Sequence, residues 1–266
     1  PDMLVLRTPR DLDDEIRDKI AGFCDVNINS VIVCKDAKIL YEVATNLYKQ
    51  NIDSIICDYF GLETKPIDLT EWNELIRKVK HMNGKIRIAL VGKYVQLHDA
   101  YISVAEALKS AGYEVGKEIE IDWVQSDHSD DPEFLEHLKQ ADGILVPGGF
   151  GSRATNGKMK AARYARENGI PYLGICYGMQ LAVIEFMRNV VGIKDASSTE
   201  IDPATSEPVI DYLPDQYEGL NLGGTLRLGS FECKLKENSL VRSLYGTEII
   251  HERHRHRYEF NNDYKK

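Results

Sequence analysis

The sequence has no hydrophobic run near the roughly 18 residues that a helix needs to cross a bilayer, which argues against a membrane protein. It also lacks a basic segment followed by an apolar core at its start, so no signal peptide is visible. Cysteine is scarce: five residues, an odd number and widely spaced, argue against a disulfide framework and for a reducing compartment. We therefore expect a cytoplasmic protein with no membrane partner. Because the chain starts with proline, we expect the natural protein to begin upstream.

Positive charge is in deficit. The 33 Lys and Arg residues against 42 Asp and Glu residues give a net charge of −9. This balance disfavours non-specific binding to nucleic acid, but it leaves room for a local basic pocket. Internal repeats and low-complexity tracts are absent as well. The 266 residues, 43% hydrophobic and 28% charged, are typical of a globular protein with one large or two ordinary domains.

From Lys85 onward, short apolar runs alternate with amphipathic stretches at helical spacing. This rhythm predicts an α/β fold: a parallel sheet with helices on both faces. Ligands of such sheets bind beyond the carboxyl ends of the strands. The expected strands are 3–6, 31–33, 86–91, 119–124, 143–146 and 172–175, and the expected helices are 12–23, 39–48, 71–79, 99–110, 132–140, 158–167 and 179–188.

The most informative segment is 174–180 (Gly-Ile-Cys-Tyr-Gly-Met-Gln), which lies between an apolar run and a helical stretch. A Gly-x-Cys-x-Gly spacing at that place predicts a sharp strand-to-helix turn with the Cys176 side chain at its apex, a thiol version of the nucleophile elbow. The start of the following helix would lower the pKa of the thiol and offer N–H groups to an oxyanion. The alternative is that Cys176, like the other four cysteines, is a small buried hydrophobe.

A second glycine turn, 148–151 (Gly-Gly-Phe-Gly), follows the expected strand 143–146. Glycines there allow a backbone N–H to approach a reacting carbonyl closely. The two glycine turns should share one crevice, since both follow strand ends of the same sheet. A phosphate loop ending at Gly157-Lys158 is excluded, because Ser152 stands where the leading glycine is required and Met159 follows the lysine.

Histidine and arginine alternate in 251–260 (His-Glu-Arg-His-Arg-His-Arg-Tyr-Glu-Phe). On a strand, His254 and His256 would share a face and could chelate a metal ion, although no cysteine or carboxylate stands nearby at a recognisable ligand spacing. The three arginines would line the opposite face, either as a solvated stripe or as a clamp for a carboxylate or phosphate. A nucleophilic cysteine needs a histidine base, and no His-x-Glu or His-Pro-Glu follows Cys176.

Several stretches match the sequence pattern of one family. They are 92–94, 99–103, 145–151, 164–168, 174–183, 198–200, 222–229 and 252–259. With them the chain resembles the CTP synthase family over nearly its whole length. The Gly-x-Cys-x-Gly turn is shared by all triad amidotransferases, whereas the tail at 252–259 and the Gly-Lys-Tyr at 92–94 are specific to CTP synthases.

The resemblance implies a triad glutamine amidotransferase fold, flavodoxin-like, preceded by a partial α/β synthetase segment. Residues 1–60 would end the synthetase domain, 61–84 would be a linker, and 85–266 would be the amidotransferase domain, truncated before its catalytic histidine and glutamate. In this family ATP phosphorylates O4 of UTP, and ammonia released from glutamine displaces the phosphate to give CTP. The resemblance also implies Mg, GTP as allosteric activator and a homotetramer, with no nucleic-acid partner.

Residue roles follow from the same resemblance. Cys176 would be the nucleophile, and the N–H groups of Gly149 and Tyr177 would form the oxyanion hole. Glutamine would be held by these two residues with others that match the motif, namely Gly178, Met179, Gln180, Glu200 and Arg257.

Nucleotide contacts would come from the N-terminal part. Lys19 matches a lysine that contacts UTP or CTP, and Lys35, Asp36 and Ala37 match a segment near the ATP adenine. A lid associated with GTP activation corresponds to 213–226.

Three departures from the family pattern stand out. Tyr177 replaces the usual leucine. The phosphate loop and magnesium ligands of the family do not appear, so no metal site is expected in this chain. The His-Pro-Glu motif does not appear either. The chain is therefore expected to be a piece of the enzyme without full activity. A non-catalytic assembly or regulatory module of the same fold is the alternative, and another triad amidotransferase or a γ-glutamyl hydrolase is disfavoured by residues 1–60 and the tail.

Overall fold

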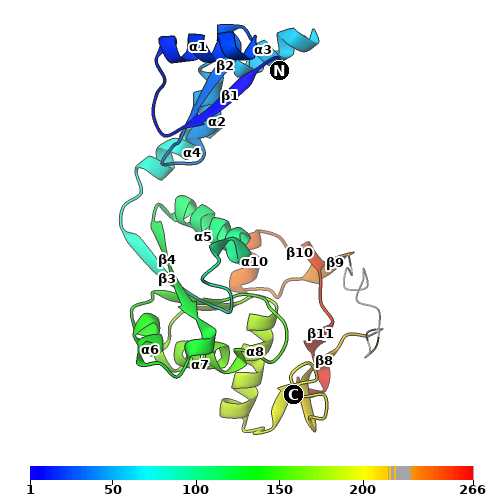
Figure 1. The fold of residues 1–266 in the computed structure, drawn as a ribbon. Helices are drawn as coiled ribbons and strands as arrows, with labels where there is room; N and C mark the ends of the chain where they lie inside the picture. The colour runs from blue at the N-terminus through cyan, green and yellow to red at the C-terminus, as the bar shows by residue number, and fades with distance from the viewer. Residues whose placement is uncertain (215, 217–218, 220–228, 266) are drawn as a thin grey trace. The chain divides into compact units, whose positions relative to one another are not determined.

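The computed structural model describes residues 1–214, 216, 219 and 229–265. It divides into two compact units, which are considered separately (Figure 1). The first unit is residues 1–84 together with 110–118, and the second is residues 85–109 and 119–266. Most of the segment expected to form a lid, 213–226, falls outside the described residues. No helix in the described ranges combines the length and hydropathy that a bilayer span requires.

The first unit contains two parallel strands, β1 (Leu4–Thr8) and β2 (Val31–Lys35), which pair in the register Leu4↔Val31. Both strands were expected at these places. Four helices accompany them: α1 (Asp14–Cys24), α2 (Glu42–Tyr48), α3 (Ile52–Phe60) and α4 (Thr70–Lys80). The periodicity did not predict α3, and α2 is shorter than the expected helix 39–48.

Helix α4 lies within the stretch expected to be a linker, where the spacing predicted a short helix. It buries Ile76 and Val79 on one face. Its Trp72 Nε1–H donates a hydrogen bond of 2.9 Å to the carbonyl oxygen of Tyr41, and the two rings meet edge to face. Helix α4 is therefore packed against α2's N-terminal flank rather than free in solvent.

The second unit is built on a four-stranded sheet in the order β4-β3-β5-β6. Its strands are β3 (Lys85–Gly92), β4 (Glu118–Gln125), β5 (Gly143–Val146) and β6 (Tyr172–Gly174). Parallel pairing joins Ile88 to Gly143 and Ile144 to Tyr172. Each of these strands coincides with an expected one to within one or two residues.

Helices cover both faces of this sheet, because alternate side chains of a strand point to opposite sides. Ala89 and Val91 pack with α6 (Pro132–Lys139) and α7 (Thr155–Asn168), whereas Leu90 packs on the other face with α5 (Ile102–Val115). The predicted α/β fold with a parallel sheet and helices on both faces is confirmed.

Helix α8 (Tyr177–Phe186) begins two residues earlier than expected, directly after Cys176. It packs on a second, three-stranded sheet in the order β11-β8-β7. Strands β7 (Ala196–Ser198), β8 (Glu207–Tyr212) and β11 (Tyr258–Phe260) form that sheet. A hairpin-like pair, β9 (Gly229–Lys234) and β10 (Ile249–His254), and the short helix α10 (Leu240–Tyr245) complete the second unit.

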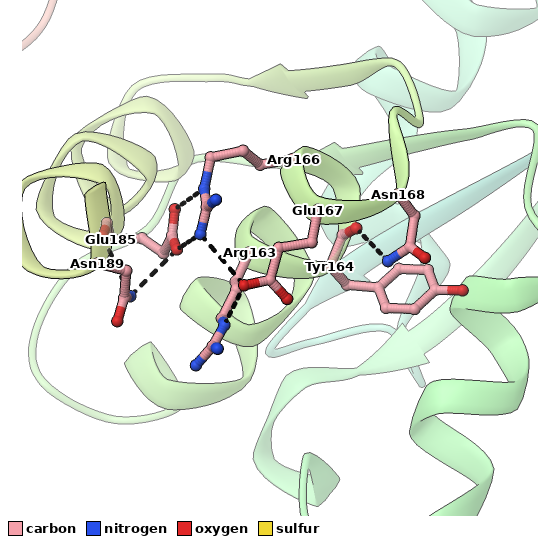
Figure 2. A network of polar contacts seen from close by, with 7 residues as sticks. All are labelled: Arg163, Tyr164, Arg166, Glu167, Asn168, Glu185 and Asn189. Atoms are coloured by element: carbon pink, nitrogen blue, oxygen red, sulfur yellow. Dashed lines mark hydrogen bonds and ion pairs between the residues drawn. The ribbon is translucent and has the colours of Figure 1, made fainter.

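An ion pair with a buried carboxylate ties α8 to α7 (Figure 2). The Arg166 guanidinium contacts the Glu185 carboxylate through two hydrogen bonds, of 2.6 and 3.1 Å. Asn189 donates a third hydrogen bond to the same carboxylate at 3.1 Å. Since α8 starts at the cysteine turn, this pair helps to hold the helix on which the turn depends.

Candidate active site

The turn between β6 and α8 holds Cys176 in a backbone conformation that residues with a side chain rarely adopt. Its φ is 54° and its ψ is −107°. A β-carbon at Gly174 would lie 2.5 Å from the Met179 amide nitrogen, and one at Gly178 would lie 2.0 Å from the Val146 carbonyl oxygen. Both glycines are thus required by close backbone approach. The strand, sharp turn and helix predicted around Cys176 are present.

Because the backbone at Cys176 is strained, we expect the Cys176→Gly variant to be more stable than Cys176→Ala by about 1 kcal/mol. At an ordinary position the order is reversed, since glycine loses more conformational entropy on folding. Urea unfolding of both variants measures the difference. An alanine variant as stable as the glycine variant would show that the positive φ costs nothing.

The two glycine turns lie side by side. Val146 and Gly174, the last residues of β5 and β6, are paired in register, so both turns leave the same edge of the sheet. A β-carbon at Gly148 would lie 3.5 Å from the Cβ and 3.9 Å from the Sγ of Cys176. The expectation that both turns share one crevice is confirmed.

The loop 148–151 is held from three directions. The Gly151 N–H donates to the Glu200 carboxylate at 2.7 Å, and the Tyr177 hydroxyl donates to the Gly151 carbonyl at 2.6 Å. The Lys93 ammonium donates to the Phe150 carbonyl at 2.5 Å. These bonds fix the backbone of the loop directly after Gly149.

Burial raises the pKa of the Cys176 thiol above its ordinary value, and the nearby Glu200 carboxylate adds to the rise. Three features oppose it: the hydrogen bond from the Tyr177 N–H, the charge of Lys158 and the hydrogen bond from the Gly149 N–H. The two N–H groups that the resemblance names for an oxyanion hole are therefore both directed at the sulfur. Donors placed so can also stabilise an oxyanion that forms beside it.

Cys176 opens into a cavity of about 400 Å³. Five residues named from the sequence meet there: Gly149, Cys176, Gln180, Glu200 and Arg257. The other lining residues are Phe150, Arg255, His256 and Tyr258. A cavity of this size with a carboxylate, two guanidinium groups and an amide suits a small zwitterion such as an amino acid.

Three further residues named from the sequence do not line this cavity. Tyr177 is only 1% exposed and reaches the site through its N–H and its hydroxyl bond to the loop. Gly178 is buried in α8. The Met179 side chain lines a separate cavity of about 570 Å³ together with Tyr172 and Gly174.

The interpretation of the tail as one continuous strand is wrong. Strand β10 ends at His254 and pairs with β9, whereas β11 begins at Tyr258 and pairs with β8. Residues 255–257 cross between two sheets, so His256 and its arginine neighbours line one cavity instead of opposite faces. Burial, with the neighbouring His254, lowers the pKa of His256 and favours the neutral ring. Among the described residues no group of three or more His, Cys, Asp or Glu side chains could hold a metal ion.

Gln180 and Arg257, two of the residues expected from the sequence to hold glutamine, are themselves held by neighbouring residues. The Gln180 amide donates to the Tyr258 carbonyl at 3.0 Å. The Arg257 guanidinium lies over the rings of Tyr212 and Tyr258, 5.6 and 5.7 Å from their centroids. The first contact joins α8 to β11. The second joins Arg257, in the cavity wall, to β8 and β11.

In the first unit, Lys35, Asp36 and Ala37 line a separate hollow of about 600 Å³. Lys35 pairs with Asp11 at 2.5 Å and Asp36 with Arg7 at 2.9 Å. Lys19 does not line this hollow, and its ammonium pairs with Glu15 on the exposed side of α1 at 2.6 Å. The nucleotide residues named from the sequence are thus only partly brought together.

Sequence reasoning missed Lys158, which is fully buried beside the cysteine turn. The signal was available, because Lys158, Ala161, Ala162 and Ala165 recur at helical spacing on one face of α7. A lysine on that apolar face is unusual, since lysine is almost never fully buried.

Comparison with known families agrees with this geometry. The family model described as glutamine amidotransferase class-I matches residues 96–266. The chain belongs to this family. A second family model, described as CTP synthase N-terminus, matches residues 1–62.

Curated relatives match the whole chain. CTP synthases of Shouchella clausii and Halalkalibacterium halodurans are each 53% identical to this amidotransferase over 265 residues, covering 100% of the chain and 50% of the relative. The CTP synthase of Staphylococcus aureus strain NCTC 8325 is 53% identical over 266 residues. The predicted resemblance to CTP synthases is confirmed, and the chain spans about half the length of these relatives.

A solved structure is similar as well. It is the glutaminase domain of a Trypanosoma brucei CTPS with bound acivicin, at a TM-score of 0.62 and 38% sequence identity. The match covers 67% of this amidotransferase chain and 69% of that chain.

Proposed function

We propose that this chain supplies the glutamine-hydrolysing site of an enzyme that aminates UTP to CTP at the expense of ATP. One observation carries the proposal: Cys176 stands on a strained turn, opens into the cavity, and receives hydrogen bonds from the Gly149 and Tyr177 N–H groups. This arrangement provides a nucleophile together with donors for the charge that develops when it attacks a carbonyl.

The chemistry is acyl transfer from an amide. The Cys176 thiol gives its proton to a base, and its sulfur forms a bond to the side-chain carbonyl carbon of glutamine. The carbonyl electrons move to oxygen, where the Gly149 and Tyr177 N–H groups hold the negative charge. Collapse of this intermediate breaks the C–N bond, and the nitrogen leaves as ammonia after accepting a proton. Water then cleaves the thioester to give glutamate and the free thiol. The His-Pro-Glu motif that would carry the base in this family does not occur in the sequence.

Charged groups of the cavity suit the rest of the glutamine molecule. The Arg257 guanidinium fits the α-carboxylate in a two-bond fork. The Glu200 carboxylate fits the α-ammonium group, although one of its oxygens already accepts from Gly151. Gln180, fastened to Tyr258, presents its amide to the same space.

The remaining roles belong to the whole enzyme. The hollow at Lys35, Asp36 and Ala37 is proposed to lie near the ATP adenine, and Lys19 to contact UTP or CTP. ATP, Mg, GTP activation and a homotetramer are expected of the complete protein. The residues described here do not form a magnesium site, so no step through Mg is assigned to them.

Acivicin, which is bound in the similar glutaminase domain, tests the proposal as a glutamine-like label. We expect it to modify Cys176 and glutamine to protect the thiol, with the adduct located by mass spectrometry. Cys176→Ala should abolish labelling. Arg257→Met should weaken protection by glutamine at least tenfold, because it removes charge-assisted hydrogen bonds of about 1.5–3 kcal/mol.

The exposed Cys233 serves as an internal control and should stay unmodified at the same acivicin concentration. Glutamate release is followed in parallel. A folded chain whose Cys176 is not labelled would contradict the proposal and favour a non-catalytic module of the same fold. Labelling that glutamine does not suppress would place the reactive thiol outside a glutamine site.

A further inference from the structure

The buried face of α7 carries a charge. Lys158 is 0% exposed, and its ammonium has no hydrogen-bond partner among the residues that the structure describes. A buried ammonium without a partner is costly, and native proteins rarely keep one without a reason. The other lysine of this helix, Lys160, is exposed and pairs with Asp130.

The Lys158 ammonium lies directly behind the two residues that face the thiol. It stands 5.2 Å from the centroid of the Tyr177 ring, in a cation–π arrangement. A β-carbon at Gly149 would lie only 3.2 Å from its Nζ. Gly149 and Tyr177 are also the residues whose N–H groups hydrogen-bond to Cys176. The positive charge of Lys158 therefore lies next to both residues that provide the N–H donors.

Lysine and cysteine act on each other electrostatically. Burial, and after it the charge of the nearby Lys93, lowers the pKa of Lys158 to about 8, although Cys176 and Asp127 oppose the fall. The charge of Lys158 in turn opposes the rise in the pKa of Cys176. Glu200, which raises the pKa of Cys176, is the carboxylate that faces the thiol. Away from water such interactions are stronger than at the surface.

We infer that Lys158 is a positioning residue of this site. Its ammonium, packed against the Tyr177 ring behind Gly149, stabilises negative charge on the Cys176 sulfur and then on the oxyanion held by the two N–H groups. The catalytic purpose of this role rests on the proposed glutaminase function. The electrostatic effect of Lys158 on the thiol is measurable without turnover. The tyrosine that departs from the family's usual leucine supplies the ring that the ammonium faces.

The test is the rate of Cys176 alkylation by iodoacetamide, read by mass spectrometry of the Cys176 peptide. Lys158→Met keeps the length of the side chain and removes the charge. We expect it to lower the alkylation rate at pH 7, where Lys158 is charged, about tenfold. Lys160→Met, on the exposed side of the same helix, should leave this rate unchanged. A merely structural role would change the unfolding temperature without changing this rate.

A second measurement covers the case in which Lys158→Met does not fold. It is the pH profile of Cys176 alkylation in the wild type. Because Lys158 loses its charge near pH 8, below the pKa of the thiol, the logarithm of the rate should rise less steeply above pH 8 than below it. One uniform slope up to the pKa of the thiol overturns the inference, as does a folded Lys158→Met variant with the wild-type alkylation rate at pH 7.

The two proposals fail in different ways. A wild-type chain that acivicin does not label refutes the glutamine site, whatever Lys158 does. Normal acivicin labelling together with an unchanged alkylation rate at pH 7 in Lys158→Met refutes the role of Lys158 and leaves the glutamine site intact.

Discussion

Gly178→Ala is expected to destabilise the second unit by about 4 kcal/mol, because the new methyl group has no space. Its β-carbon would lie 2.0 Å from the carbonyl oxygen and 2.8 Å from the carbonyl carbon of Val146. These are backbone atoms of a strand in the middle of the sheet, so no side chain can rotate away to relieve the overlap. The helix α8 must move instead, and the Cys176 turn moves with it.

Urea unfolding measures the loss, and acivicin labelling measures what remains of the site. Gly22→Ala is the matched control, because Gly22 also lies in a helix but has nothing within 4 Å of its β-carbon position. That change should stabilise α1 slightly, by about 0.5–1 kcal/mol. A Gly178→Ala protein that unfolds like the wild type and keeps its reactive thiol would show that α8 does not approach β5 so closely.

Arg166→Met is expected to destabilise the same unit by about 3 kcal/mol, because it leaves the Glu185 carboxylate buried without its partner. The Glu185 side chain is 4% exposed, and the Arg166 side chain is 31% exposed. Figure 2 shows the two hydrogen bonds of the pair and the additional one from Asn189. The partial exposure of Arg166 places the expected loss at the lower end of the range for buried pairs.

A double variant separates the ion pair from simple packing. Arg166→Met combined with Glu185→Met should recover most of the lost stability, since an apolar pair of similar volume does not leave a buried charge. Arg163→Met is the control on the same helix, because Arg163 pairs with Glu167 at the surface, where side chains are 55% and 45% exposed. It should change the free energy of unfolding by less than about 0.5 kcal/mol. A loss equal to that of Arg166→Met would mean that burial does not matter to the pair.

Local patterns predicted much of the fold. Short apolar runs and glycine turns located the strands of the second unit, because strands covered on both faces bury consecutive residues. The periodicity missed α3. At the start of α1, Asp13 accepts from the Ile16 N–H, whereas Asp11 pairs with Lys35. Several acidic residues in a row offer competing caps, and local propensity does not choose between them.

The cysteine turn and its family could be recognised without coordinates, since Gly174, Cys176 and Gly178 must stand at that spacing for the backbone to turn so tightly. The cavity wall is different: the family resemblance named several of its residues, but no local pattern of this sequence brings them together. Gly149, Glu200 and Arg257 come from segments far apart in the chain, and their meeting depends on how β5, β7 and β11 are brought together.

The sequence pattern thus predicts the fold class, the family and the place of the cysteine turn, because these depend on short-range constraints written in neighbouring residues. The burial of Lys158 against Tyr177, the passage of 255–257 between two sheets and the single cavity that results depend on tertiary packing. Long-range contacts of this kind arise from the summed packing of distant elements, and no local stretch of sequence encodes them alone.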